Sequence, residues 1–260
     1  MILTIGMPSY RNPAEVWATL TALKMYHDLS DVEVLVVDNF GDLQVKEIVK
    51  NSKFRYERFT EQQGASPAKN RVFELATGYF VLCIDSHVLL WEDSVKKLKE
   101  WIGENSEKAK NLIQGPMMYA SGKKFASEWN NKWRGGMWGV WGATETIPPK
   151  EEKEVEIFAS ALLGCRKDSW LGFPQKARGF GGQSGVIHQK YIKAGRKTII
   201  LPFLIWAHNF HRQCREYPAK DGDVIRNYLL GFKEIDLDPE PIYQHFGEIR
   251  VKEIENGMSK

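Results

Sequence analysis

The sequence has few cysteines, no long hydrophobic run and no large excess of charge of either sign. Cys83, Cys165 and Cys214 are odd in number and show no CxxC spacing, which argues against a disulfide framework or a cysteine-based zinc site. No apolar stretch reaches the roughly 18 residues of a membrane span, and the start, MILTIGMPSY, lacks the pattern of a secretory signal. With 43% hydrophobic and 27% charged residues in 260, we expect a soluble cytoplasmic globular protein without membrane contact.

Positive charge is concentrated in one part of the chain, although the net charge is only +3. Residues 166–226 hold 12 Lys and Arg against 4 Asp and Glu. Such an excess suits a diphosphate or a nucleic-acid backbone. A solvated basic face without a ligand is equally consistent with it.

Short apolar runs alternate with helical patterns over the first hundred residues, which predicts a mostly parallel sheet with crossover helices. The expected strands are 2–6, 32–38, 54–59 and 79–85. Helices are expected over 13–28 and 66–76, the second with Ser66 as N-cap. Further along we expect an exposed loop at 148–156, a strand at 157–165, a helix closed by Gly195, and one or two helices from 221 to 247.

Polar residues follow three of the expected strands, where ligands bind in open parallel sheets. They are Pro8, Ser9 and Tyr10, then Asp38 and Asn39, then Asp85, Ser86 and His87.

Asp85 and His87 form a DxH motif directly after a strand. On an extended backbone their side chains point to the same side, which makes half of a metal site. Oxygen and nitrogen ligands with open positions suit Mn²⁺ or Mg²⁺ bound together with substrate phosphates. His208, just past another strand-like run, is the best-placed third ligand. The alternative is that Asp85 and His87 only cap the strand.

The segments LTIGMPSYRN, VLVVDN and GASPAKNRVFELATGYFVLCIDSH resemble, in this order, the A-type nucleotide-sugar glycosyltransferases of family 2. The resemblance spans roughly residues 2–217. It implies an α/β fold of the GT-A type, with a mostly parallel central sheet flanked by helices. The implied catalytic domain is 1–217, divided into a nucleotide-binding half (1–110) and an acceptor and metal-completing half (111–217), with a helical extension at 218–260.

The DxH form is similar to that of the polypeptide N-acetylgalactosaminyltransferases, in which FGGQS (180–184) matches a Trp-Gly-Gly-Glu-Asn segment. This resemblance makes His208 the third metal ligand and Lys69 the basic residue before the motif. It implies a loop with His211, Arg212 and Tyr217 that closes over the donor diphosphate, and an acidic uridine contact at Asp38. The other substrate-binding residues that we expect are Pro8, Ser9, Tyr10, Ser86, Gly164, Gly181 and Gly182.

Three of these residues have a structural alternative. Asp38 could instead cap the following turn, Tyr10 could pack in the core, and Lys69 could lie solvated in the first turn of its helix.

Gln183 stands where inverting enzymes of this fold usually carry an acidic base, and glutamine cannot accept a proton at pH 7. We therefore expect a retaining, front-face transfer in which the departing phosphate takes the proton. Asp168, Asp221 and Asp223 remain as possible bases.

The expected reaction moves a sugar from a UDP-sugar to an acceptor hydroxyl. A hydroxymethylated DNA base, as some bacteriophage enzymes use, is the leading acceptor, since the segment is basic and Trp133, Trp138 or Trp141 could support a flipped base. This would place the enzyme in the host cytoplasm. Stacking of these tryptophans on a sugar is an equally good interpretation. The alternatives are a protein, glycan or lipid acceptor, or a non-catalytic nucleotide-sugar-binding protein.

Overall fold

An eight-stranded mixed sheet forms the centre of the computed structural model, which describes residues 1–208, 217, 220 and 222–258. In sheet order its strands are β11 (Lys153–Val155), β13 (Thr198–Ile200), β6 (Leu112–Gln114), β12 (Leu162–Arg166), β4 (Phe80–Ile84), β1 (Leu3–Ser9), β2 (Val32–Asp38) and β3 (Arg55–Arg58). β4, β1, β2 and β3 are parallel, whereas β12 runs antiparallel to both β4 and β6. The central sheet that we predicted is therefore present, but it is mixed, with an antiparallel strand at its centre.

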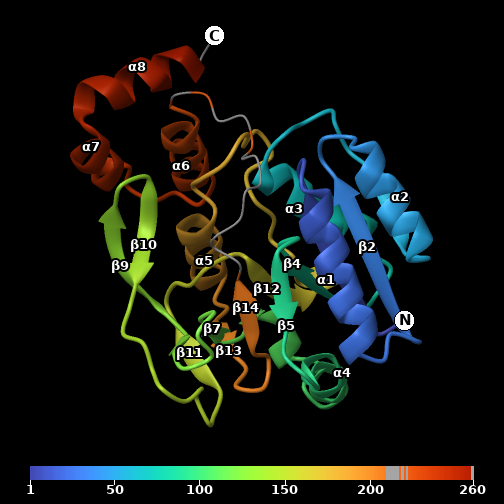
Figure 1. Cartoon of the computed structure of the whole chain (residues 1–260). Coiled ribbons are helices and arrows are strands. Elements are labelled where there is room, and N and C mark those ends of the chain that lie inside the picture. Colours follow the sequence, from blue (N-terminus) through green and yellow to red (C-terminus); the bar gives the residue numbers. More distant parts are fainter. Residues whose placement is uncertain (209–216, 218–219, 221, 259–260) are drawn as a thin grey trace.

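Helices cover both faces of this sheet (Figure 1). They are α1 (Pro13–Tyr26), α2 (Leu43–Asn51), α3 (Ala65–Leu75), α4 (Ser94–Glu104) and α5 (Ser184–Lys193), with short 3-10 turns at Lys108–Lys110 and Lys167–Ser169. Successive strand residues point to opposite faces, so the buried residues form two clusters. One cluster joins alternate residues of β1, β2 and β4 to α1, α2 and α4, and the other joins the intervening residues of β2 and β4 to α3 and α5.

Gly6 lets α3 lie directly on β1. A Cβ at Gly6 would be 2.0 Å from Cγ1 of Val72, so no other residue fits there without moving the helix. This close packing brings the N-terminal turn of α3, with Lys69, to the carboxyl ends of β1 and β4.

A second, four-stranded sheet and a hairpin accompany the main sheet. The second sheet has the order β5 (Val88–Leu90), β14 (Trp206–His208), β7 (Met117–Met118) and β8 (Phe125–Ala126), and the hairpin consists of β9 (Trp129–Arg134) and β10 (Met137–Trp141). The C-terminal helices α6 (Asp223–Glu234), α7 (Glu240–Phe246) and α8 (Glu248–Met258) lie beside the hairpin, on the side of the molecule away from α2 (Figure 1). The segment 221–247, where one or two helices were expected, holds α6 and α7, and α8 follows it.

Several local predictions were wrong. The strand expected over 157–165 begins only at Leu162 and ends at Arg166. Helix α3 begins at Ala65, one residue before the expected cap Ser66, because the backbones of residues 64 and 179 pair there: Ala65 N donates to Gly179 O at 2.9 Å. The segment 148–156 is not entirely loop, since Lys153–Val155 form edge strand β11 and pair with β13. Val155 points into the core while its charged neighbours stay outside, an alternation that is typical of an edge strand.

The thiols of Cys83 and Cys165 are buried and free, and burial raises the pKa of each to about 12. Both therefore serve as core residues, as expected, whereas Cys214 lies outside the described residues. Among the described helices, none is both long enough and apolar enough for a membrane span.

Candidate active site

A cavity of about 370 Å³ opens at the carboxyl ends of β1 and β4. The turn after β1, the turn after β4, the start of α3, the end of β14, the hairpin and the glycine-rich segment before α5 all contribute to its wall. The strand-end clusters after the first and fourth predicted strands therefore meet in one cavity. Asp38 and Asn39, after the second, lie outside its wall.

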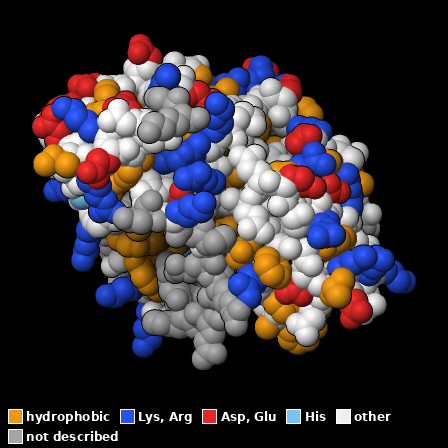
Figure 2. All heavy atoms as spheres, turned by 90° about the horizontal axis from the view of Figure 1, so that it is seen from above, with side chains coloured by type: hydrophobic (Ala, Val, Ile, Leu, Met, Phe, Trp, Pro, Cys, Tyr) orange, Lys and Arg blue, Asp and Glu red, His pale blue; other side chains and the backbone are white. Residues whose placement is uncertain are grey.

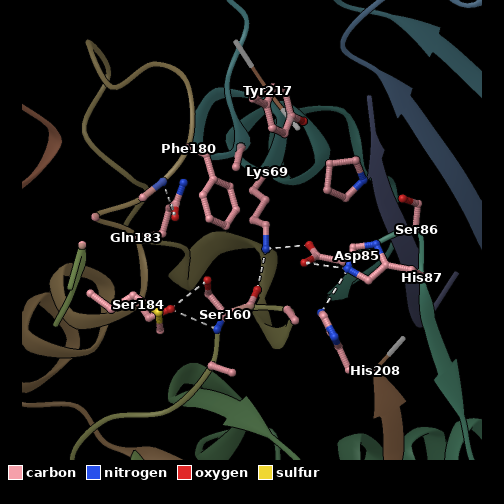
Figure 3. Close-up of a pocket in the computed structure, with 18 of the residues that line it drawn as sticks. Lys69, Asp85, Ser86, His87, Ser160, Phe180, Gln183, Ser184, His208 and Tyr217 are labelled. Carbon is pink, nitrogen blue, oxygen red and sulfur yellow. Dashed lines mark hydrogen bonds and ion pairs between the residues drawn. The ribbon is translucent and has the colours of Figure 1, made fainter. Parts of the chain in front are cut away.

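Asp85, His87 and His208 meet at one end of this cavity (Figure 3). One ligand atom from each lies within 4.8 Å of those of the other two. Nε2 of His87 is 3.0 Å from Nε2 of His208 and 3.9 Å from Oδ2 of Asp85. Antiparallel pairing of β5 with β14 sets His208 opposite Val88, and so beside His87.

The backbone at the DxH motif is a turn and not the extended strand that we expected. β4 ends at Ile84, and Val88 N donates to Asp85 O at 3.0 Å before β5 begins. The two side chains still converge, because the turn folds them toward the same side of the sheet edge. The metal prediction thus relied on a wrong local geometry, although the residues come together.

The three side chains suit a first-row divalent ion. A carboxylate with two imidazoles, open on the cavity side, is a donor set that Mn²⁺ accepts readily while keeping positions for water or phosphate oxygens. Mg²⁺ prefers oxygen ligands, so the two histidines favour Mn²⁺. Nδ1 of His87 lies 3.6 Å from Oε2 of Glu15, a carboxylate positioned to orient the ring.

Lys69 is buried and paired with Asp85, which excludes the solvated alternative. Its side chain is 5% exposed, and Nζ lies 2.8 Å from Oδ1 of Asp85 and donates to Ser160 O at 2.5 Å. Burial opposes ionisation of Asp85, but the ammonium of Lys69, together with His87 and His208, holds the pKa of Asp85 below its ordinary value. Asp85 is therefore ionised at neutral pH, as a metal ligand must be.

A hydrogen-bond network fixes Ser160, which the sequence did not single out. Ser160 N donates to Ser184 Oγ at 3.3 Å, and Ser184 Oγ donates to Ser160 Oγ at 3.1 Å. The fully buried His188 accepts from Phe158 N through Nε2 at 3.1 Å and bonds Ser184 O through Nδ1 at 2.5 Å. Burial lowers the pKa of His188 to about 4, so the imidazole is neutral and ties α5 to the segment before β12.

We call the end of the cavity that holds Asp85, His87 and His208 the metal end. Tyr10 and Tyr217 also line the cavity, and Tyr10 belongs to the turn that we predicted to contact the nucleoside. Their ring centroids are 4.4 Å apart, and Tyr10 also meets Phe40 edge to face at 5.4 Å. Burial raises the pKa of Tyr217 well above the ordinary tyrosine value. His211 and Arg212, predicted for the same loop as Tyr217, lie outside the described residues.

Asp38 is fully buried and caps the turn after β2, as the structural alternative anticipated. Its Oδ1 accepts from Phe40 N and Gly41 N, each at 3.0 Å, and its Oδ2 accepts from the Tyr56 hydroxyl at 2.9 Å. Burial and this carboxylate raise the pKa of Tyr56.

The other predicted substrate-binding residues divide into two groups. Pro8, Ser86, Gly181, Gly182 and Gln183 line the cavity. Ser9 is buried behind it and donates to Asn12 Oδ1 at 2.9 Å, and Asn12 in turn donates to Ser86 Oγ. Asn12 is a cavity residue that the sequence reasoning missed, and its only sequence signal is its position directly before α1.

Gly164 and Trp133 do not reach the cavity. Gly164 lies within β12, where a Cβ would be 2.7 Å from the Phe80 ring, so its role is packing between strands. Trp133 stacks on Trp138, with centroids 5.5 Å apart, and packs against Tyr228 and Phe246 of the C-terminal helices.

The possible alternative bases also lie elsewhere. Asp168 pairs with Arg166 on the surface, and Asp223 is buried against Arg178 at 2.7 Å. Neither lines the cavity, and Asp221 lies outside the described residues.

The model of the family described as Glycosyl transferase family 2 matches residues 4–167. The chain belongs to glycosyl transferase family 2. This match covers the predicted nucleotide-binding half and continues through β12. No curated protein matches the sequence significantly.

Solved structures of the same fold match nearly the whole of this family 2 chain at low identity. GalNAc-T7 with UDP, GalNAc and Mn²⁺ gives a TM-score of 0.66 at 13% identity, over 90% of this chain and 48% of that one. TarS 1-349 of S. aureus with UDP-GlcNAc gives 0.60 at 16% identity, over 95% and 71%. The mannosyltransferase PcManGT of Pyrobaculum calidifontis with GDP-Man and Mn²⁺ gives 0.58 at 15% identity, over 92% and 66%. The chain thus spans about half the length of GalNAc-T7, and these likenesses show the GT-A fold alone.

Proposed function

We propose that the protein transfers a sugar from a UDP-sugar to an acceptor hydroxyl, with a divalent ion held by Asp85, His87 and His208. The observation that carries this proposal is the convergence of these three side chains beside the buried Lys69–Asp85 pair at the end of a cavity. The structures with UDP, UDP-GlcNAc or GDP-Man support a nucleotide-sugar donor.

The residues at the metal end match the charge of a departing diphosphate. A divalent ion, when bound there, would neutralise negative charge as the bond to the sugar breaks. Lys69 adds a positive charge at a fixed position, because Asp85 and Ser160 hold its Nζ on two sides. Preorganised charge of this kind needs no rearrangement during the reaction.

The nucleoside would lie beside Tyr10 and Tyr217, next to the metal end. Tyr10 and Tyr217 offer ring surfaces there, and both line the cavity. The uridine contact predicted for Asp38 stays a prediction, since the carboxylate already accepts from Phe40 N, Gly41 N and the Tyr56 hydroxyl.

Gln183 supports retention of the anomeric configuration. Among the described residues that line the cavity, Asp85 is the only carboxylate, and it is committed to Lys69 and the metal site. In a front-face transfer the bond from C1 to the diphosphate oxygen breaks, the acceptor oxygen bonds to C1 on the same face, and its proton moves to the departing phosphate. No side-chain base is needed for that step.

Two measurements test the proposal. Wild-type protein should hydrolyse a UDP-sugar in the presence of Mn²⁺ and lose this activity with EDTA. NMR of the transferred product should show the anomeric configuration of the donor, and an inverted centre would contradict the retaining mechanism. A protein that binds UDP-sugar but never cleaves it would instead be the non-catalytic binder.

The DNA acceptor stays a prediction, and the contacts of Trp133 and of the basic segment 166–226 do not favour it. Trp133 packs against the C-terminal helices, and four basic residues of the segment 166–226 are engaged in ion pairs: Arg166–Asp168, Arg178–Asp223, Lys190–Glu234 and Lys197–Glu154. Figure 2 nevertheless shows a band of Lys and Arg side chains along the middle of the upper face. Hydroxymethylated DNA therefore belongs in the acceptor panel, together with protein, glycan and lipid acceptors.

A further inference from the structure

Two buried N–H donors in the wall of the cavity have no partner among the described residues. They are Nε1 of Trp129 and Nε2 of Gln183, on side chains of residues that are 8% and 7% exposed. A buried donor without an acceptor destabilises the folded protein. Two such donors on residues that line one cavity are candidates for hydrogen bonds to ligand oxygens.

Both donors are held in place by the fold. Gly181 N donates to Oε1 of Gln183 at 3.2 Å, so the amide presents its NH₂ group and not its oxygen to other partners. The Trp129 ring lies against Gly139, where a Cβ would come within 2.5 Å, and meets Trp141 edge to face at 5.3 Å. The donors are therefore preorganised.

The donors lie apart from the metal end. Ring contacts lead from His208 to Trp206 at 6.1 Å, then to Phe158 and to Trp129 in steps of 6.3 Å each. Figure 3 likewise shows Gln183 and Ser184 on the side of the cavity away from Asp85 and His208. We call the part lined by Trp129, Met137, Trp138, Trp141 and Gln183 the aromatic end.

The aromatic end carries no charge. Two side chains among the described lining residues, besides the two histidines, are charged at pH 7. They are Lys69 and Asp85, which pair with each other. A phosphate or carboxylate placed here would lose its hydration without gaining a partner. The aromatic end is thus suited to an uncharged ligand.

Neighbouring groups cover the ring of Trp138 at the aromatic end. Trp138 lies against Gly185, where a Cβ would be 2.3 Å from its ring, and stacks on Trp133 with an interplanar angle of 6°. A nucleobase would require a free face for stacking, whereas a sugar ring requires apolar walls and N–H donors for its hydroxyl oxygens.

We propose that the aromatic end is the acceptor subsite and that it takes an uncharged carbohydrate, whose hydroxyl oxygens accept from Gln183 Nε2 and Trp129 Nε1. This inference rests on the proposed function, since the donor sugar would project from the metal end toward Gln183. It assigns the substrate class of the acceptor and two residues that recognise it.

Saturation-transfer NMR with wild-type protein, UDP and Mg²⁺ tests the inference. The probes are the methyl β-glycosides of glucose, galactose and N-acetylglucosamine, with methyl glucuronide, glycerol phosphate and a hydroxymethylcytosine DNA duplex as comparators. At least one neutral glycoside should bind. Trp129→Phe and Gln183→Met, which each remove a donor and keep most of the volume, should each weaken this binding about fivefold, as the loss of one hydrogen bond predicts.

Matched controls separate recognition from packing. Trp101→Phe changes a tryptophan that is also 8% exposed but lies outside the cavity, and Gln189→Met changes the glutamine within α5, which does not line it. Both should bind the glycoside as wild type does. Binding of only the charged probes or the DNA, binding of none of the probes, or equal binding by all variants would overturn the inference.

Hydrolysis of UDP-sugar with Mn²⁺, measured on the same proteins, separates a failure of the proposed function from a failure of the acceptor assignment. Hydrolysis without binding of any neutral glycoside leaves the proposed function and removes the acceptor assignment. Glycoside binding that depends on Trp129 and Gln183, without donor cleavage, leaves a carbohydrate site and removes the proposed function.

Discussion

The two ends of the cavity are built in different ways. At the metal end, Asp85 and His87 directly follow a strand, and His208 comes from the strand that pairs with β5. At the aromatic end, a hairpin meets α5 and α6 through contacts between distant segments, such as the hydrogen bond from Trp138 N to the Tyr228 hydroxyl, 90 residues away in sequence. The comparison indicates that strand topology fixes the position of the candidate metal ligands, whereas packing between distant segments shapes the aromatic end, the proposed acceptor subsite.

The largest effect is expected from Asp85→Asn, which keeps the size of the side chain and removes the charged ligand. Mn²⁺-dependent hydrolysis of UDP-sugar should fall about a thousandfold, because a metal ion contributes several kcal/mol to stabilising the developing charge. Asp31→Asn is the control, since Asp31 forms only an exposed ion pair with Lys99. Equal activity of the Asp85 variant and wild type would contradict the claim that the metal end, unlike the aromatic end, carries the hydrolysis of UDP-sugar.

Lys69→Met should affect both stability and activity. It leaves the Asp85 carboxylate without its buried partner, so the free energy of unfolding at pH 7 should fall by about 3 kcal/mol in urea titrations. The lowered pKa of Asp85 contributes stability above the ordinary aspartate value of about 3.9, and this contribution is lost as the pH falls. The difference from wild type should therefore narrow below about pH 4.

The control for Lys69 is Lys97→Met, which removes an exposed pair with Asp93 at 3.9 Å. It should change stability by less than about 1 kcal/mol. A stability loss at Lys69 no greater than at Lys97 would show that the Lys69–Asp85 pair is not a buried support of the metal end.

His188 should make the protein less stable as the pH falls. Its folded pKa of about 4 lies below the unfolded value of about 6.5, so the unfolded state binds more protons between these values. The free energy of unfolding should drop by up to roughly 3 kcal/mol between pH 6.5 and 4 from this residue alone. His188→Gln should flatten that part of the urea-derived stability profile. An unchanged slope would show that His188 does not cause the loss of stability between pH 6.5 and 4.

The smallest effect on stability is expected from Phe180→Ala. Phe180 lines the cavity but is 52% exposed, so the free energy of unfolding should change by less than about 1 kcal/mol. The KM for UDP-sugar should still rise about fivefold, since an aromatic contact contributes about 1 kcal/mol. Trp91→Ala, at an exposed aromatic outside the cavity, should leave KM unchanged.

The sequence was informative wherever local pattern decides the structure. The buried runs at β1, β2 and β4, the polar residues after them and the DxH motif predicted the sheet and the metal end. The sequence pattern did not predict the start of α3, because backbone pairing of residues 64 and 179 sets it. It also did not predict β11, a charged segment that becomes a strand by pairing with β13.

Residues that act through distant partners were not predictable. Asn12 bonds Ser86 across 74 residues, and Ser160 accepts from Lys69 across 91. Trp133 was expected in the site because tryptophans cluster in that segment, but only the packing of α6 and α7 decides which of them turn inward. Single residues in such regions carry no local signal of their role.

Binding of Mn²⁺ in the presence of UDP, followed by electron paramagnetic resonance, tests the central claim most directly. Wild-type protein should remove the signal of the free ion at one equivalent, and His208→Ala should restore most of it. His27→Ala, at a histidine outside the metal cluster, should behave as wild type. Equal Mn²⁺ binding by wild type and the His208 variant would contradict the assignment of the metal end.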